Sequence, residues 1–162
     1  MPDPTPIDRN IERMQAVRQE ILDLVASLDP KTIETRPVVG EWTVRQVLIH
    51  LADAEKAHRR YAQGLIAGTL TTTAADAANF DVNRWNAGSI ARRDAETVAE
   101  ALVRLAAERE ATLAFLPTIP DDAWGISGVH PALGELSVLG AVKVIGLHEK
   151  MHLKEMRDGI KA

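Results

Sequence analysis

Apolar residues recur every three or four positions in four stretches of the chain. This spacing is typical of amphipathic α-helices, each with one face turned towards a protein core. The sequence shows no internal repeat and no low-complexity tract. The four predicted helices cover residues 6–28, 44–67, 95–116 and 138–158.

The second predicted helix has the clearest start signal. Thr43 is a good N-cap, and Gln46 stands three residues later, where it can return a hydrogen bond to the N–H of the cap. Trp42 before the cap and Val47 after it can form a hydrophobic staple. Gly68 follows the last periodic residue and closes the helix.

The other three helices have simpler boundaries. The Asp29-Pro30 pair ends the first, and Pro117 ends the third. We expect N-caps and a C-cap at three further positions, namely Asp94 for the third helix and Ser137 and Gly159 for the fourth.

The connections between these helices are long, at about 14, 26 and 20 residues. Ordinary turns within bundles have about 2–8 residues. A link of about 26 residues can run the length of a bundle, so the second and third helices can lie parallel. The sequence therefore predicts an all-α fold, a four-helix bundle with one long crossover. Residues 79–86, inside this link, can form a short helix of their own.

Composition supports one domain over residues 1–162. Hydrophobic residues make up 46% of the chain and aromatic residues only 4%, which favours helices over a β-sandwich. The net charge is -4 without a basic stripe, which argues against a nucleic-acid partner. The chain has no cysteine, so disulfides, thiolate–metal sites and a cysteine nucleophile are excluded.

No stretch of the sequence reaches the roughly 18 apolar residues of a membrane span. The N-terminal segment, residues 1–8, is rich in Pro and Asp and lacks the apolar run of a signal peptide. We therefore expect a cytoplasmic protein without a membrane partner.

His148 and His152 lie in the middle of the apolar stripe of the fourth helix. They are four residues apart, so their side chains share one helix face with Cβ atoms roughly 5–6 Å apart. A metal ion would satisfy one nitrogen on each ring, and this spacing is the usual helical chelate. The alternative is a pair of core histidines that are hydrogen-bonded to neighbours, and the pattern leaves both open.

A third ligand would come from another helix at the same height. If the second and fourth helices are antiparallel, the helical rise of about 1.5 Å per residue places His50 level with the pair. His58 is nearer the centre of its own apolar stripe but lies two turns deeper. Periodicity alone does not choose between the two, whereas height favours His50.

The same residues carry a family resemblance. The segment Gly40-Glu41-Trp42-Thr43, continuing to His50-Leu51 and Glu55, resembles the G-x-W-S/T-x6-H-L-x3-E signature of the DinB/YfiT-like superfamily of metal-dependent enzymes. The segment from His148 to His152 resembles the H-x3-H motif on its last helix. The resemblance spans nearly the whole chain.

This resemblance implies a bundle with up-down-down-up order and a metal site on His50, His148 and His152. It implies zinc or nickel as the usual metal in this site. It also implies that the protein forms a homodimer, as members of the family frequently do. Characterised members of the family are thiol-dependent transferases that use bacillithiol, mycothiol or glutathione, or a mycothiol-dependent maleylpyruvate isomerase. Many members have no known reaction.

Three protein ligands leave one position of a tetrahedral metal open, as in catalytic sites. Such a metal acidifies a bound water or thiol. The expected protein is therefore a metal-dependent enzyme, either a hydrolase or a thiol S-transferase that takes its thiol from a small molecule. The first alternative is a non-catalytic metal-binding or stress-response bundle. The second is a plain helical dimer with core histidines.

Three carboxylates can orient an imidazole or act as a base. Asp53 lies one turn from His50, and Glu155 shares a helix face with His152. For Glu149 the sequence favours a solvated surface position. Asp53 and Glu155 are thus the candidate catalytic residues.

Two arginines, Arg18 and Arg109, stand inside apolar stripes. Each is a candidate anchor for an anionic group of a substrate or thiol, but a buried ion pair such as Arg18 with Glu55 is the favoured explanation. Trp85 and Trp42 are candidates for the wall of an apolar pocket, with a capping role at least as good for Trp42. His130, in a loop, is expected to be exposed.

Overall fold

The computed structural model describes residues 6–162. Four long helices form the bundle: α1 (Pro6–Ala26), α3 (Val44–Ala67), α6 (Val98–Phe115) and α7 (Val138–Lys161). Residues 1–5 belong to the segment for which we predict no signal peptide, and they lie outside the described residues. Within the described part, no helix is long and apolar enough to cross a membrane.

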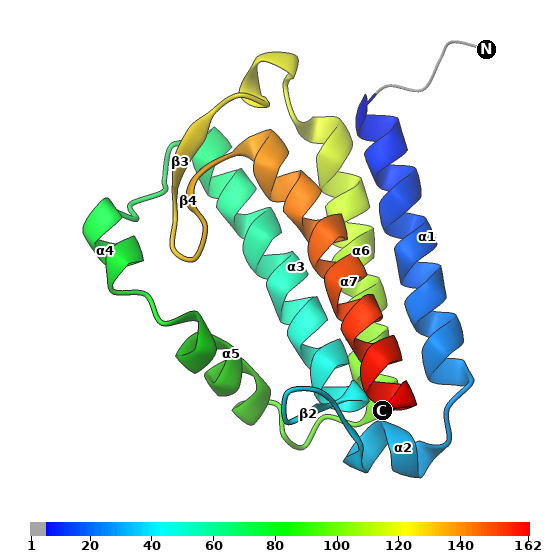
Figure 1. The fold of residues 1–162 in the computed structure, drawn as a ribbon. Coiled ribbons are helices and arrows are strands. Elements are labelled where there is room, and N and C mark those ends of the chain that lie inside the picture. Colours follow the sequence, from blue (N-terminus) through cyan, green and yellow to red (C-terminus); the bar gives the residue numbers. More distant parts are fainter. Residues whose placement is uncertain (1–5) are drawn as a thin grey trace, which may run out of the picture.

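The order of the bundle is the predicted one. Figure 1 shows α3 and α6 running in one direction and α1 and α7 in the other. The link between α3 and α6 crosses the length of the bundle and carries two short helices, α4 (Ala74–Ala78) and α5 (Val82–Ala91). The long crossover and the short helix inside it are therefore confirmed.

The caps of α3 follow the sequence. The Thr43 side chain accepts a hydrogen bond from the backbone N–H of Gln46, and the Thr43 N–H donates to Oε1 of Gln46 at 2.9 Å. Gly68 ends the helix in the left-handed region, with φ of 65°. Ser137 caps α7 as predicted.

Two predicted helix ends are wrong. Helix α6 begins after Thr97, not Asp94, because Thr97 and Glu100 form a complete capping box. Helix α7 continues past Gly159 to Lys161. Gly159 meets a packing need instead, since a Cβ there would lie 2.5 Å from the backbone of Val38.

Smaller elements complete the chain. Helix α2 (Pro30–Thr35) begins at the proline expected to end the first helix, and two short 3-10 turns follow α6 at Leu116–Thr118 and Asp121–Ala123. Two antiparallel hairpins, which the all-α prediction omitted, pair β1 (Pro37–Val39) with β2 (Trp42–Thr43) and β3 (Ser127–His130) with β4 (Gly134–Ser137). The second hairpin lies beside the end of α3 (Figure 1).

Candidate metal centre

The antiparallel packing of α3 and α7 brings three imidazoles to one point. Nε2 of His148 lies 3.0 Å from Nε2 of His50 and 3.1 Å from Nε2 of His152. One ligand atom from each residue lies within 4.8 Å of the others. The structure thus brings together the three histidines that height and the family motif select.

Burial keeps these imidazoles neutral at neutral pH. Burial, together with the neighbouring His148 and His152, lowers the pKa of His50 to about 3. Burial also lowers the pKa of His148 and the pKa of His152 to about 4. Neutral imidazoles have a free lone pair on one ring nitrogen, which is the form that binds a metal.

The arrangement fits a divalent metal ion. Tetrahedral bonds of about 2.0–2.1 Å separate neighbouring nitrogen ligands by roughly 3.3 Å, close to the two distances above. Hydrogen bonding alone serves the cluster poorly, because Nε2 of His148 faces two other Nε2 atoms and can carry at most one proton. Nδ1 of His50 has no hydrogen-bond partner among residues 6–162.

Glu155 lies where a carboxylate can orient one ligand. Its Oε2 is 2.7 Å from Nδ1 of His152, although neither atom meets the angles of a hydrogen bond with any partner in the described chain. A carboxylate at this position favours a proton on Nδ1 and leaves Nε2 free to face the other imidazoles. Of the two candidate catalytic residues, Glu155 therefore contacts a ligand.

Asp53 faces elsewhere. It accepts hydrogen bonds from Arg104 at 2.5 Å, from Arg93 at 3.2 Å and from Ser89. These partners come from α5, α6 and the turn between them, so Asp53 ties the crossover to α3. The described contacts do not join Asp53 to the three histidines, which corrects its expected role beside His50.

The two candidate anchors, Arg18 and Arg109, belong to a buried ion network. Arg18 donates to Glu55 at 2.7 Å, which confirms the favoured ion pair, and to Glu149 at 2.7 Å. Arg109 donates to Glu55 at 2.9 Å and to Glu149 at 2.7 Å. Each arginine also donates to one backbone carbonyl, that of Leu105 or that of Met14.

The network corrects the expectation for Glu149. Its exposed fraction is only 1%, because α7 is covered on a second side by α1. Two positive and two negative side chains balance one another, and neither arginine lines the cavity described next. Arg18 and Arg109 are therefore structural in this fold and do not contact the candidate site.

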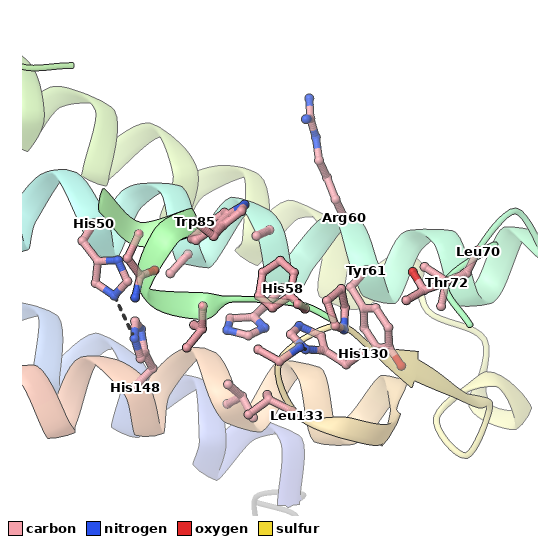
Figure 2. Close-up of a pocket in the computed structure, with 18 residues that line it drawn as sticks. His50, His58, Arg60, Tyr61, Leu70, Thr72, Trp85, His130, Leu133 and His148 are labelled. Carbon is pink, nitrogen blue, oxygen red and sulfur yellow. Dashed lines mark hydrogen bonds between the residues drawn. The ribbon is translucent and has the colours of Figure 1, made fainter. Parts of the chain in front are cut away.

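A cavity of about 440 Å³ opens beside the histidines. His50 and His148 lie at one end, and Tyr61, Leu70 and Thr72 lie at the other (Figure 2). Trp85 lines it from α5, as expected for a pocket wall, whereas Trp42 packs beside His50 with ring centroids 5.1 Å apart. The lining is largely apolar, so the cavity suits a molecule with an apolar part.

Sequence reasoning missed the middle of this cavity. His130 was expected to be exposed, but it is 8% exposed and stacks on His58 with ring centroids 5.1 Å apart. Its ring also meets Tyr61 edge-on. A sequence signal was present in residues 127–137, because Pro131 and Gly134 are turn residues that separate two short segments, as in a hairpin with a longer loop.

A four-helix bundle with one crossover and three converging histidines beside an apolar cavity defines a class of metal-site protein. The chain belongs to the DinB superfamily, whose family model matches residues 13–156. A search of curated proteins gave no match.

Two solved structures are similar in fold. The first is YfiT from Bacillus subtilis, a probable metal-dependent hydrolase with an unusual four-helix bundle topology. It has 20% identity and a TM-score of 0.74, with 95% of this chain and 85% of that chain covered. The second is TT2238, a four-helix bundle protein. It has 22% identity and a TM-score of 0.55, with 93% of this chain and 98% of that chain covered.

Proposed function

We propose that this protein is a metal-dependent enzyme that binds one divalent transition metal, zinc or nickel, through His50, His148 and His152. One observation carries the proposal: three neutral imidazole nitrogens converge at the end of an apolar cavity. Family membership and the description of YfiT as a probable metal-dependent hydrolase support it.

A divalent metal held by His50, His148 and His152 would acidify a bound water or thiol and polarise a substrate carbonyl. The protein's own residues do the rest. Glu155 holds the ring of His152 in one orientation. The largely apolar wall that includes Trp85 excludes bulk water and positions the substrate.

Hydrolysis is the reaction class we propose first, because it needs only water and the metal site. A thiol S-transferase is the second candidate. The chain has no cysteine, so the thiol would be a small molecule, and a cavity of about 440 Å³ has room for part of one. The homodimer implied by the family resemblance stays a prediction, which analytical ultracentrifugation can check.

The first experiment measures metal content in protein purified without a metal-affinity tag. We expect about one zinc, nickel or similar ion per chain, with most of it lost in His148→Ala and in His152→Ala. Full metal content in both variants would show that the site is elsewhere. Wild-type protein without metal, even after incubation with zinc or nickel, would favour core histidines in a plain helical bundle.

The second experiment tests the reaction. The metal-loaded protein is assayed on ester, amide and lactone substrates without thiol, and on electrophiles with bacillithiol, mycothiol or glutathione. A hydrolase turns over without thiol and loses activity in His148→Ala. A transferase requires the thiol. Metal binding without either activity would favour a non-catalytic metal-binding bundle.

A further inference from the structure

A second recess, of about 380 Å³, adjoins the apolar cavity, and Trp85 lines both. Four cationic side chains line it, namely Lys56 and Arg60 from α3 and Arg92 and Arg93 from the end of the crossover. We call this space the cationic recess. It shares Ala57, Arg60 and Trp85 with the apolar cavity, so the two spaces are neighbours.

The charge of the cationic recess is poorly balanced. Asp53 is the one carboxylate among its lining residues, and it is already paired with Arg93 and with Arg104 behind it. Lys56 lies 3.7 Å from Glu108, which in turn pairs with Arg59. No ion pair is found for Arg60 or Arg92 within the described chain. This surplus of positive charge stands out in a chain with a net charge of -4.

The side chains are placed to serve a molecule that extends from the cavity. Figure 2 shows Arg60 pointing away from the imidazoles, and Arg60 lines both spaces. Trp85 contributes to both spaces and offers a flat apolar surface between them. Arginine guanidinium groups bind carboxylate and phosphate oxygens through paired hydrogen bonds.

We propose that the cationic recess binds the carboxylate or phosphate group of a substrate or thiol whose apolar part fills the neighbouring cavity. The proposal rests on the proposed function for its metal end. It assigns the anchoring role to Arg60 and Arg92, since Arg18 and Arg109 are fully used inside the bundle. The expected ligand is thus amphipathic and anionic, and a neutral apolar molecule of the same length binds less well.

Calorimetric titration tests this with three probes of one chain length: octanoate, octyl phosphate and uncharged octanol. The protein is used after chelator treatment and again after loading with zinc. We expect an anionic probe to bind more tightly than octanol and to weaken as salt rises. Arg60→Gln and Arg92→Gln should each lower its affinity on the order of threefold, and the double variant on the order of tenfold.

Arg13→Gln is the matched control, because Arg13 is an exposed cation on α1, on the far side of the bundle from α5 (Figure 1). It should leave all affinities unchanged, and octanol should bind equally to every variant. A preference for octyl phosphate identifies a phosphate ligand, and a preference for octanoate a carboxylate.

Three results would overturn the proposal. The first is equal affinity for octanol and both anions, and the second is no binding of any probe at millimolar concentration. The third is anion affinity that is insensitive to Arg60→Gln and Arg92→Gln. Failure of the proposed function has a different signature, because zinc uptake is measured separately. If the protein takes up no metal but still binds the anionic probes in a charge-dependent way, the proposed metal-dependent function is refuted and the anion site is supported.

Discussion

Consecutive residues of α7 belong to two buried polar clusters that differ in one respect. Glu149 faces α1 and α6, where its carboxylate is paired with Arg18 and Arg109. His148 faces α3 and the cavity, where its Nε2 meets two other imidazole nitrogens. The ion network is balanced within the chain, whereas the histidines have lone pairs that only a further group can use. Burial of polar atoms alone therefore does not mark a functional site; unsatisfied bonding capacity does.

The largest effect is expected from a substitution that disrupts the balanced ion network. Arg109→Leu leaves the carboxylates of Glu55 and Glu149 buried with one arginine, and should lower the free energy of unfolding by about 3–5 kcal/mol. Urea denaturation measures this. Arg157→Leu is the control, because Arg157 pairs with Glu20 at the surface and should cost at most about 1 kcal/mol. Equal losses in the two variants would contradict a structural role for the network.

Next in size is the effect of removing one candidate ligand from the histidine cluster. Zinc at a hundred times its dissociation constant should stabilise the wild type by about 2.7 kcal/mol, since it binds the folded state alone. His50→Ala should lose most of this gain. His58→Ala should keep nearly all of it. The ring centroid of His58 is 6.2 Å from that of His148, but His58 stacks on His130 and is not among the three histidines whose nitrogens converge. Thermal unfolding with zinc or chelator measures both, and the reverse pattern would move the site to His58.

A smaller effect is expected from the carboxylate behind the site. Glu155→Gln removes the charge that orients His152 and should lower zinc affinity by about 10–100-fold without abolishing it. Asp158→Asn, on the same helix, is the matched control, because its carboxylate forms an exposed ion pair with Lys154. Competition with a fluorescent chelator gives both affinities. If Asp158→Asn lowers zinc affinity as much as Glu155→Gln does, the loss is due to the change in net charge and not to the orientation of His152.

The smallest effect concerns pH in the metal-free protein. The pKa of His148 is lowered from 6.5 to about 4, so between these values the unfolded chain binds more protons than the folded one. Stability is therefore fully present above about pH 6.5 and falls as the pH drops towards 4. His148→Leu should reduce this fall by at most about 1.4 kcal/mol per pH unit. Denaturation between pH 7 and 5 checks it, and an identical slope in both proteins would argue against a buried neutral His148.

The sequence predicted those parts of the molecule that depend on helical geometry. The rise per residue along α3 and α7 predicted that His50 lies opposite His148 and His152. The length of the crossover predicted the direction of α6. It failed where the answer depends on packing between elements. Glu149 looks like a surface residue on its own helix and is buried only because α1 covers that side.

The cavity was beyond the same reasoning for a related reason. His130 comes from the β3–β4 hairpin, and its place beside His58 depends on how that hairpin folds against α3. Asp53 has helical spacing suitable for contact with the candidate metal site, yet Arg104 and Arg93 pair with it from neighbouring elements. Local periodicity contains no information about such partners from distant segments.

The candidate ligands and one part of the cavity wall come from different kinds of segment. His50, His148 and His152 stand on α3 and α7, which also form part of the wall. The rest of the wall belongs to connections: residues of the crossover, such as Trp85, and the hairpin tip from Pro131 to Leu133. Connections tolerate substitution and insertion far better than packed helices. Evolution, or a protein engineer, can therefore exchange the crossover and the hairpin tip to admit different molecules while the histidine geometry stays as it is.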